Sequence, residues 1–412
     1  MIRGKKVLAL VMAGGPGGRL EVLTEERAKP VMPYAGVYRL IDFPMSNCMH
    51  SGISDVWVIA QYQPQSLTDQ LAHGRPWDLD RTYGGMRLVP PRQGGSESGW
   101  HQGNADAIYR NKTLIADFDP DVLVVLSSDH VYKLDYVEVI NHHLDCEADV
   151  TIVTTEVPDD EAARFGLVEV DDDGRVTNFE YKPDEPQSNL AATEVFVYDT
   201  RKLLETIEAL VAEDADDDEA ALEDYGDELL PRLVEEGRAY EYRHDGYWRD
   251  VGTVEDYWAS NMDLIHADPE LVLDDPDWPI LTLGVDRPPA RISGTASIVD
   301  ALISPGCVIQ GRVERSVLSP GVFVHEGATV RDSIILHETV IGPDATVDCS
   351  ILDAEVSVGE RAGIGTRRDP DAQNSGPSDS EIALVGKGAS IQDGARVAAG
   401  DHVKPGATIE SS

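Results

Sequence analysis

The stretch that decides the fold of the first half is "LALVMAGGPGGRLEVLTEERAKP", at residues 8–30. The apolar run over residues 7–12 is typical of a parallel strand that is buried on both faces. The glycines that follow directly let backbone amides approach a ligand closely and point at it, as a phosphate requires. Arg19 and Lys29 would add fixed positive charge. The stretch therefore predicts a loop that holds the phosphates of a nucleoside triphosphate.

Two other interpretations of this stretch are weaker. The dinucleotide-binding fingerprint Gly-x-Gly-x-x-Gly would need a third glycine at position 20, which is Leu. A secretory signal would need an Ala-x-Ala cleavage site and a longer apolar core than the roughly seven residues found here. We therefore expect a phosphate-binding loop.

Composition bounds the class of protein. A chain of 412 residues predicts two domains, and none of its segments approaches the roughly 20 apolar residues of a membrane span. The net charge of -41 argues against nucleic acid and anionic membranes as partners, because both repel an acidic surface. The four cysteines form no Cys-x-x-Cys pair, which argues against a zinc site and a disulfide framework. We expect a cytoplasmic protein.

The first part of the chain alternates strand-like and helix-like segments. Short β-branched runs alternate with amphipathic stretches such as residues 104–118 and 136–144. This alternation predicts a doubly wound, Rossmann-like α/β domain over residues 1–285, with ligands at the carboxyl ends of its strands. The predicted strands cover residues 56–62, 122–130, 149–157 and 192–199.

From about residue 290 the pattern changes to a six-residue period. Aliphatic residues recur at this spacing, with small residues and glycines between them. Such a period is the signature of a left-handed parallel β-helix, predicted for residues 286–412. The recurring residues are Val324, Val330 and Leu336, Ile341 and Val347, Val358 and Ile364, and Val385, Ile391, Val397, Val403 and Ile409.

Charged residues mark the predicted strand ends. Asp129 follows the buried run at 122–128, and Asp250 lies in "GYWRDVGT" at residues 246–253. Acids at such strand ends commonly hold Mg²⁺ on phosphate oxygens. Lys182 in "FEYKP" is a second isolated cation. Each residue alone is most simply a surface ion pair, but together they favour a site for attack on phosphorus.

Several longer motifs carry a family resemblance. Together they resemble the bacterial ADP-glucose pyrophosphorylases, which are glucose-1-phosphate adenylyltransferases of the sugar nucleotidyltransferase superfamily. The resemblance covers essentially the whole chain. It implies transfer of AMP from ATP to a sugar 1-phosphate, with glucose 1-phosphate as the first expectation, together with Mg²⁺ and a homotetramer built partly through the β-helix. The motifs are "AGGPGGRL" (13–20), "YRLIDFPMSNCMHSGI" (38–53), "VIAQYQPQSL" (58–67), "GNADAIYRN" (103–111), "SDHVYKLDY" (128–136), "YKP" (181–183) and "YWRDVGTVEDYW" (247–258).

The resemblance also implies roles for individual residues. It implies that the ATP phosphates are held by Gly14, Gly15, Arg19 and Lys29, and that the base lies near Gln61 and Gln93. It also implies that Mg²⁺ is bound by Asp129 and Asp250, and that the sugar phosphate is held by Gly166 and Lys182.

The departures from the family pattern cluster in the sugar pocket. The family usually has Glu before the lysine that is Lys182 here, but this chain has Tyr181. Glu194 appears where the family has a small residue, and His101 follows Trp100 in place of an aromatic residue. We expect Glu194 to supply the carboxylate lost at position 181, and His101 and Glu194 to join the sugar-binding set. Drift in a divergent subunit is the simpler alternative.

Three functions remain open at this point. The first is a catalytic ADP-sugar pyrophosphorylase, acting on glucose 1-phosphate or on another sugar 1-phosphate or nucleotide. The second is a non-catalytic regulatory subunit, which need not retain Lys29, Asp129, Lys182 and Asp250. The third is an acyltransferase, which would need a catalytic histidine between coils of the β-helix. The histidines available for that role are His325, His337 and His402, each more simply a polar loop residue.

Overall fold

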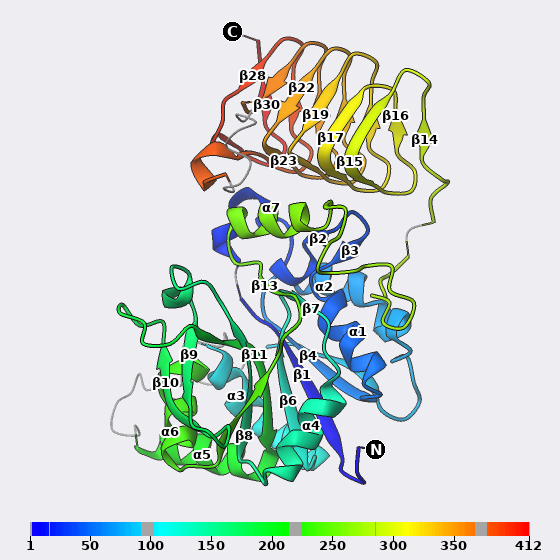
Figure 1. The fold of residues 1–412 in the computed structure, drawn as a ribbon. Coiled ribbons are helices and arrows are strands. Elements are labelled where there is room, and N and C mark those ends of the chain that lie inside the picture. Colours follow the sequence, from blue (N-terminus) through cyan, green and yellow to red (C-terminus); the bar gives the residue numbers. More distant parts are fainter. Residues whose placement is uncertain are drawn as a thin grey trace. The chain divides into compact units, whose positions relative to one another are not determined.

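The computed structural model describes residues 2–15, 17–91, 103–213, 224–284, 286–366 and 377–411 (Figure 1). Its contacts group the chain into two compact units. The first, here called the sheet unit, comprises Met1–Gly15, Phe43–Ser128 and Tyr132–Trp248. The second, here called the β-helix unit, comprises Pro16–Asp42, Asp129–Val131 and Arg249–Ser412. The boundary between two domains that the sequence predicts after residue 285 stays a prediction.

The sheet unit is built on a mixed sheet with the strand order β10-β9-β11-β6-β1-β4-β5. Strand β1 pairs in parallel with β4 and β6, while β11 runs antiparallel to β6 and β8. Strand β12 adds to β8 in parallel. The strands are β1 (Val7–Ala13), β4 (Asp55–Ala60), β5 (Gly85–Val89), β6 (Val122–Ser127), β8 (Val150–Glu156), β9 (Gly166–Val170), β10 (Val176–Tyr181), β11 (Leu190–Asp199) and β12 (Ala239–Arg243).

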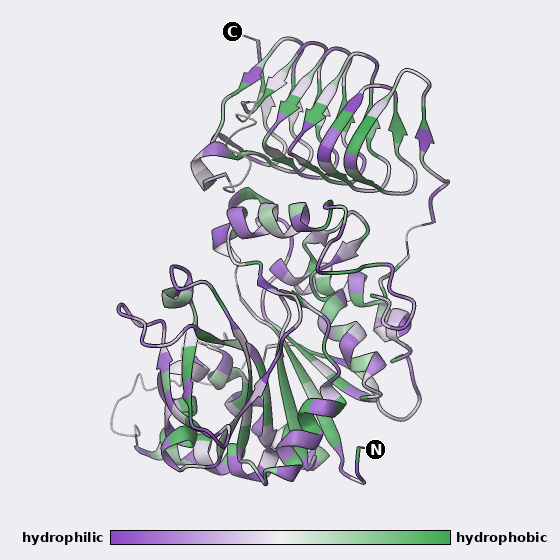
Figure 2. Ribbon diagram, viewed as in Figure 1, coloured by the Kyte–Doolittle hydropathy of each residue, from purple (hydrophilic) through white to green (hydrophobic). Residues whose placement is uncertain are grey.

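Apolar burial explains why these segments form the sheet. Every residue of β1 is buried, as expected for a central parallel strand. Figure 2 shows β1, β4 and β6 largely in the green of hydrophobic residues. The predicted amphipathic segment at 104–118 is confirmed as a helix over the same residues. The helices of this unit are α1 (Asp42–His50), α2 (Pro64–Leu71), η3 (Ala72–Trp77), α3 (Asn104–Phe118), α4 (Tyr136–Asp145), η4 (Ala162–Arg164), α5 (Thr200–Glu213), the π-helix η5 (Tyr225–Leu229) and α6 (Leu230–Glu235).

The β-helix confirms the six-residue period. Its strands pair in parallel from coil to coil, and the recurring aliphatic residues lie in the core of the prism, with Ile409 only partly buried in the last coil. The prediction of Leu336 for this core is wrong: Ile335, the last residue of β20, stacks between Leu318 and Leu352 of the adjacent coils, so the spacing here is five residues. Figure 1 shows the coils stacked one on another. The strands are β14 (Arg291–Ile292), β15 (Ser297–Ile303), β16 (Val308–Ile309), β17 (Arg312–Leu318), β18 (Phe323–Val324), β19 (Thr329–Arg331), β20 (Ile334–Ile335), β21 (Val340–Ile341), β22 (Thr346–Asp348), β23 (Ser350–Leu352), β24 (Ser357–Val358), β25 (Gly363–Ile364), β26 (Ala383–Val385), β27 (Ser390–Ile391), β28 (Arg396–Val397), β29 (His402–Val403) and β30 (Thr408–Ile409), with the short helix η7 (Asp379–Glu381) before β26.

The segment from residue 17 to residue 42 packs in the β-helix unit. The Arg27 guanidinium pairs with the Asp353 carboxylate at 2.7 Å; the Asp353 side chain is buried and the Arg27 side chain is mostly buried. A Cβ at Gly36 would lie 2.3 Å from Oγ of Ser304, so the backbone touches the coil directly. The segment and its neighbours form η1 (Gly18–Leu23), η2 (Lys29–Val31), β2 (Pro33–Tyr34), β3 (Tyr38–Arg39), β7 (His130–Tyr132), β13 (Trp248–Asp250) and α7 (Val254–Asp263).

Helix α7 completes this packing. The Trp258 indole donates to the carbonyl oxygen of Asp332 at 2.8 Å, which joins α7 to the β-helix. The Tyr257 hydroxyl donates to the carbonyl oxygen of Pro33, which joins α7 to β2. Among the helices of the described residues, none has both the length and the apolar character needed to cross a membrane.

Candidate active site

The glycine loop starts where β1 ends, and Gln61 starts where β4 ends. Ala13 and Ala60 are paired as the last residues of the two parallel strands. Gly14 and Gln61 therefore come together at the carboxyl edge of the sheet, and a Cβ at Gly14 would lie 3.6 Å from Oε1 of Gln61. Gly15 has open space where a side chain would be. This part of the predicted ATP-binding set thus forms an open backbone surface beside an amide side chain.

Lys29 belongs to the β-helix unit, where it is the buried first residue of η2. Its ammonium donates a hydrogen bond to Oδ2 of Asp129, 100 residues away in sequence. Gly17 has a φ of 68°, and a Cβ there would lie 3.0 Å from the Cβ of Lys29. Both the backbone conformation and the close approach thus require glycine at this point of the loop.

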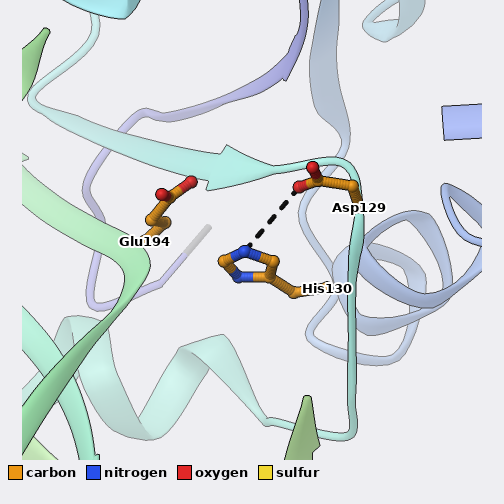
Figure 3. Close-up of side chains that lie close together, drawn as sticks. All are labelled: Asp129, His130 and Glu194. Carbon is orange, nitrogen blue, oxygen red and sulfur yellow. Dashed lines mark ion pairs between the residues drawn. The ribbon is translucent and has the colours of Figure 1, made fainter. Parts of the chain in front are cut away.

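Two carboxylates and an imidazole meet beside Lys29. Asp129 follows β6 by two residues, His130 begins β7 and Asp250 ends β13, and β7 pairs with β13. Nε2 of His130 lies 3.5 Å from Oδ1 of Asp250 and 3.7 Å from Oδ1 of Asp129. Figure 3 shows the imidazole turned toward the Asp129 carboxylate. A single buried histidine is therefore shared by both predicted acids.

Arg19 joins the same group through Gly252. A Cβ at Gly252 would lie 2.9 Å from Oδ2 of Asp250 and 3.3 Å from Nη2 of Arg19, so both side chains approach one glycine. The β-helix unit thus brings together the four predicted catalytic residues Arg19, Lys29, Asp129 and Asp250. We call these four residues and His130 the acid–cation cluster.

The electrostatics of this cluster keep it charged. Burial alone would lower the pKa of Lys29, but the carboxylates of Asp129 and Asp250 outweigh burial and raise the pKa of this ammonium. Burial alone would raise the pKa of Asp250, yet the hydrogen bond and charge of His130, together with Lys29, lower it. The Asp250 carboxylate and the Lys29 ammonium therefore stay ionised in a mostly buried place, where charges act strongly.

The carboxylates of this cluster fit a divalent metal ion. Mg²⁺ prefers oxygen ligands and is usually bound by one or two carboxylates together with substrate phosphates. Asp129 and Asp250 supply such oxygens, and both retain some exposure, with side-chain accessibilities of 22% and 16%. The donor set thus suits a hard cation that shares its remaining positions with a phosphate.

The predicted sugar-phosphate residues Gly166 and Lys182 meet in the sheet unit. Gly166 of β9 pairs with Tyr181 of β10, and the amide of Lys182 donates to the carbonyl oxygen of Phe165 at 3.0 Å. The Lys182 backbone has a φ of 48°, in the left-handed region, and its side chain is exposed. Its ammonium donates to the Tyr181 hydroxyl at 2.8 Å.

Glu194 lies in a bulge of β11. The register between β11 and β8 shifts between Ala192 and Phe196, and Glu194 within it has a φ of 54°. Bulges re-aim side chains and are common next to active sites. Burial and the Asp224 carboxylate raise the pKa of Tyr181, and the Glu194 carboxylate adds a smaller contribution in the same direction. The exchange of carboxylates between positions 181 and 194 stays a prediction.

Two predicted residues lie outside the described residues. Gln93 was predicted near the base of ATP, and His101 was predicted in the sugar pocket. Both therefore remain predictions from the resemblance.

Comparison with known proteins adds the family. The model of a nucleotidyl transferase family matches residues 8–267, and that of a GlmU-like C-terminal hexapeptide family matches residues 288–385. A glucose-1-phosphate adenylyltransferase of Acetivibrio thermocellus is 39% identical over 98% of this chain and 95% of the relative. One of Thermomicrobium roseum is 43% identical over 98% and 96%, and one of Bacillus thuringiensis is 40% identical over 87% and 94%.

This chain belongs to the glucose-1-phosphate adenylyltransferase family. The resemblance seen in the motifs is thereby confirmed. Nucleotidyltransferases of this family generally use a divalent metal ion, in keeping with the carboxylates of the acid–cation cluster.

One residue of this family member was missed by the sequence analysis. His130 is buried and shared by Asp129 and Asp250, but nothing about it stands out in "SDHVY". The available signal was its place directly after a strand-end acid, and a lone buried histidine is more often structural. Its partner Asp250 is 120 positions away, so only the fold reveals the contact.

Proposed function

We propose that this chain transfers the AMP group of ATP to glucose 1-phosphate and releases ADP-glucose and pyrophosphate, as a step toward glycogen or a related glucan. The observation that carries the proposal is the acid–cation cluster, in a chain whose relatives are named glucose-1-phosphate adenylyltransferases. A regulatory subunit without activity would have no need to keep two carboxylates beside a buried lysine.

The chemistry follows from these charges. An oxygen of the sugar phosphate attacks the α-phosphorus of ATP, the bond from this phosphorus to the β-phosphate breaks, and pyrophosphate leaves. Because the attacking oxygen belongs to the substrate, no covalent enzyme intermediate is needed. Arg19 and Lys29 hold the phosphates of ATP in line, and the Asp129 carboxylate keeps the Lys29 ammonium in place.

Metal and base recognition complete the proposal. Asp129 and Asp250 would hold Mg²⁺, which would supply positive charge to neutralise the charge that builds on the phosphate oxygens. Gly14 and Gly15 approach the nucleotide with backbone amides, and Gln61 and Gln93 lie near its base. We further propose a cytoplasmic homotetramer with contacts through the β-helix and with neither nucleic acid nor membrane as a partner.

A substrate screen tests this function. Purified protein is mixed with Mg²⁺, one nucleoside triphosphate and one sugar 1-phosphate, and pyrophosphate release is followed for each combination. We expect ATP with glucose 1-phosphate to give the highest kcat/KM. A higher value for another pair would change the assigned substrates, and no release with any pair would favour a regulatory subunit.

Lys182→Ala tests the sugar-phosphate assignment. The ammonium is proposed to meet the phosphate of the sugar substrate, and a hydrogen bond to a charged group contributes roughly 1.5–3 kcal/mol. We therefore expect the KM for glucose 1-phosphate to rise about 10-fold to 100-fold, with the KM for ATP nearly unchanged. An equal rise in both KM values would place Lys182 elsewhere.

Glu194→Gln tests whether this carboxylate reads sugar hydroxyls. We propose that Glu194 replaces the carboxylate that the family has at position 181, with glucose or a 2-amino sugar as the substrate that it favours. A site that bonds a hydroxyl can reject analogues lacking it by about 10⁴-fold. The variant should change the ranking of glucose, galactose and glucosamine 1-phosphates by kcat/KM and spare the KM for ATP. An unchanged ranking would refute the exchange.

A further inference from the structure

A chain of hydrogen bonds leads away from Lys182 into the sheet unit. The Lys182 ammonium donates to the Tyr181 hydroxyl at 2.8 Å, and this hydroxyl donates to Oδ2 of Asp224 at 2.9 Å. The ammonium also lies 4.4 Å from the centre of the Tyr181 ring. An exposed lysine is thus linked through the Tyr181 phenol to a carboxylate that lies 43 residues beyond Tyr181 in sequence.

Asp224 is itself held in place. Its other oxygen, Oδ1, accepts hydrogen bonds from the amide of Tyr225 at 3.1 Å and from the side chain of Asn104 at 3.3 Å. Tyr225 begins the π-helix η5 and Asn104 begins α3, so Asp224 ties two helix starts together. The carboxylate that accepts the hydrogen bond from the Tyr181 hydroxyl is therefore held in a fixed position.

The Tyr181 ring is fixed by packing. A Cβ at Gly226 would lie 2.2 Å from Cδ2 of Tyr181, so the ring rests directly on the backbone of η5. Burial and the nearby Asp224 carboxylate raise the pKa of Tyr181, so that its hydroxyl remains a proton donor at neutral pH. The backbone of Lys182 is fixed by its bond to Phe165. The ring and its hydroxyl are thus set before any ligand arrives.

We propose that Tyr181, anchored by Asp224, is a positioning residue that holds the Lys182 ammonium ready for the sugar phosphate. This inference rests on the proposed function, in which Lys182 meets that phosphate. A free lysine side chain samples many rotamers, and holding it in one place beforehand reduces the entropy cost of binding. The Tyr181 hydroxyl and the Asp224 carboxylate together thereby fix the side chain that is proposed to bind the sugar phosphate.

Tyr181→Phe is the direct test, because it removes the hydroxyl and keeps the ring. At saturating ATP, the KM for glucose 1-phosphate should rise about fivefold to tenfold, while kcat and the KM for ATP change less than about twofold. The melting temperature should stay close to that of the parent. Tyr198→Phe is the matched control, since the Tyr198 hydroxyl is buried in the same core without a hydrogen-bond partner among the described residues. It should leave both KM values unchanged.

A double-mutant cycle tests whether Tyr181 and Asp224 act on Lys182 together or independently. Asp224→Asn should raise the KM for glucose 1-phosphate, and the Tyr181→Phe/Asp224→Asn double variant should be no worse than the more severe single variant. Gly226→Ala keeps every polar group but displaces the ring, so it should raise the same KM. Multiplying effects in the double variant, or an unchanged KM in Tyr181→Phe, would overturn the positioning role.

Lys182→Ala distinguishes the failure of this inference from the failure of the proposed function. If Lys182→Ala raises the KM for glucose 1-phosphate and Tyr181→Phe does not, only the positioning role is wrong. If Lys182→Ala leaves that KM unchanged, the assignment of Lys182 to the sugar phosphate is wrong as well.

Discussion

Asp129→Asn and Asp250→Asn should each reduce kcat by about 10²-fold to 10³-fold or more, with the fold intact. Each change removes one negative charge from the pair of carboxylates that His130 shares, and keeps the side-chain size. The measurement is pyrophosphate release over a range of Mg²⁺ concentrations, with circular dichroism to verify folding. Near-normal activity at low Mg²⁺ in either variant would contradict the assignment of these acids to the metal.

Asp121→Asn provides a control on the same strand. Asp121 directly precedes β6, whereas Asp129 follows it, so the two acids lie at opposite ends of one strand. Asp121 pairs with Lys5 at the surface, and exposed pairs of this kind contribute about 0–1 kcal/mol. This variant should keep its turnover and its Mg²⁺ dependence, which ties the large loss to one end of β6.

Lys29→Met should reduce kcat/KM for ATP by about 100-fold. The change keeps an unbranched side chain of similar length but removes the ammonium that is proposed to hold the ATP phosphates. It also leaves the Asp129 carboxylate without this partner, and breaking a mostly buried ion pair costs about 3–5 kcal/mol. We therefore expect a lower melting temperature together with the kinetic loss.

Lys5→Met is the control for Lys29→Met, because it removes a lysine that lies outside the candidate site. Lys5 also pairs with an aspartate, but both side chains are nearly half exposed, with accessibilities of 45% and 43%. Its melting temperature and kcat/KM should match those of the parent. Parent-like kinetics in Lys29→Met would exclude a role for this lysine in holding ATP.

Much of the fold could be predicted because its signals are local. The apolar run before Gly14 forms β1, and the amphipathic segment at 104–118 forms α3 over the same residues. The six-residue period predicts the β-helix because each aliphatic residue packs against the equivalent residue of the next coil. These features depend on periodicity and burial, which a sequence displays directly.

The contacts of the candidate site depend on distant pairs. The resemblance points to Lys29 and Asp129 separately, but their hydrogen bond spans 100 residues. The link from Tyr181 to Asp224 follows from η5, a π-helix whose Gly226 makes room for the ring. The bulge that carries Glu194 is a local change of register that no periodicity reveals. Such details need the fold, since the sequence pattern does not say which strand ends meet.

The packing of residues 17–42 limits how this protein can be divided or recombined. Arg19 and Lys29 belong to the same compact unit as the β-helix, tied to it through Arg27 with Asp353 and through Trp258 of α7 with Asp332. A chimaera joined after residue 285 would replace Asp332 and Asp353 but keep their partners Trp258 and Arg27. The β-helix is therefore not an interchangeable cassette, and grafting a relative's β-helix onto this chain requires the partners of residues 17–42 to be transplanted with it.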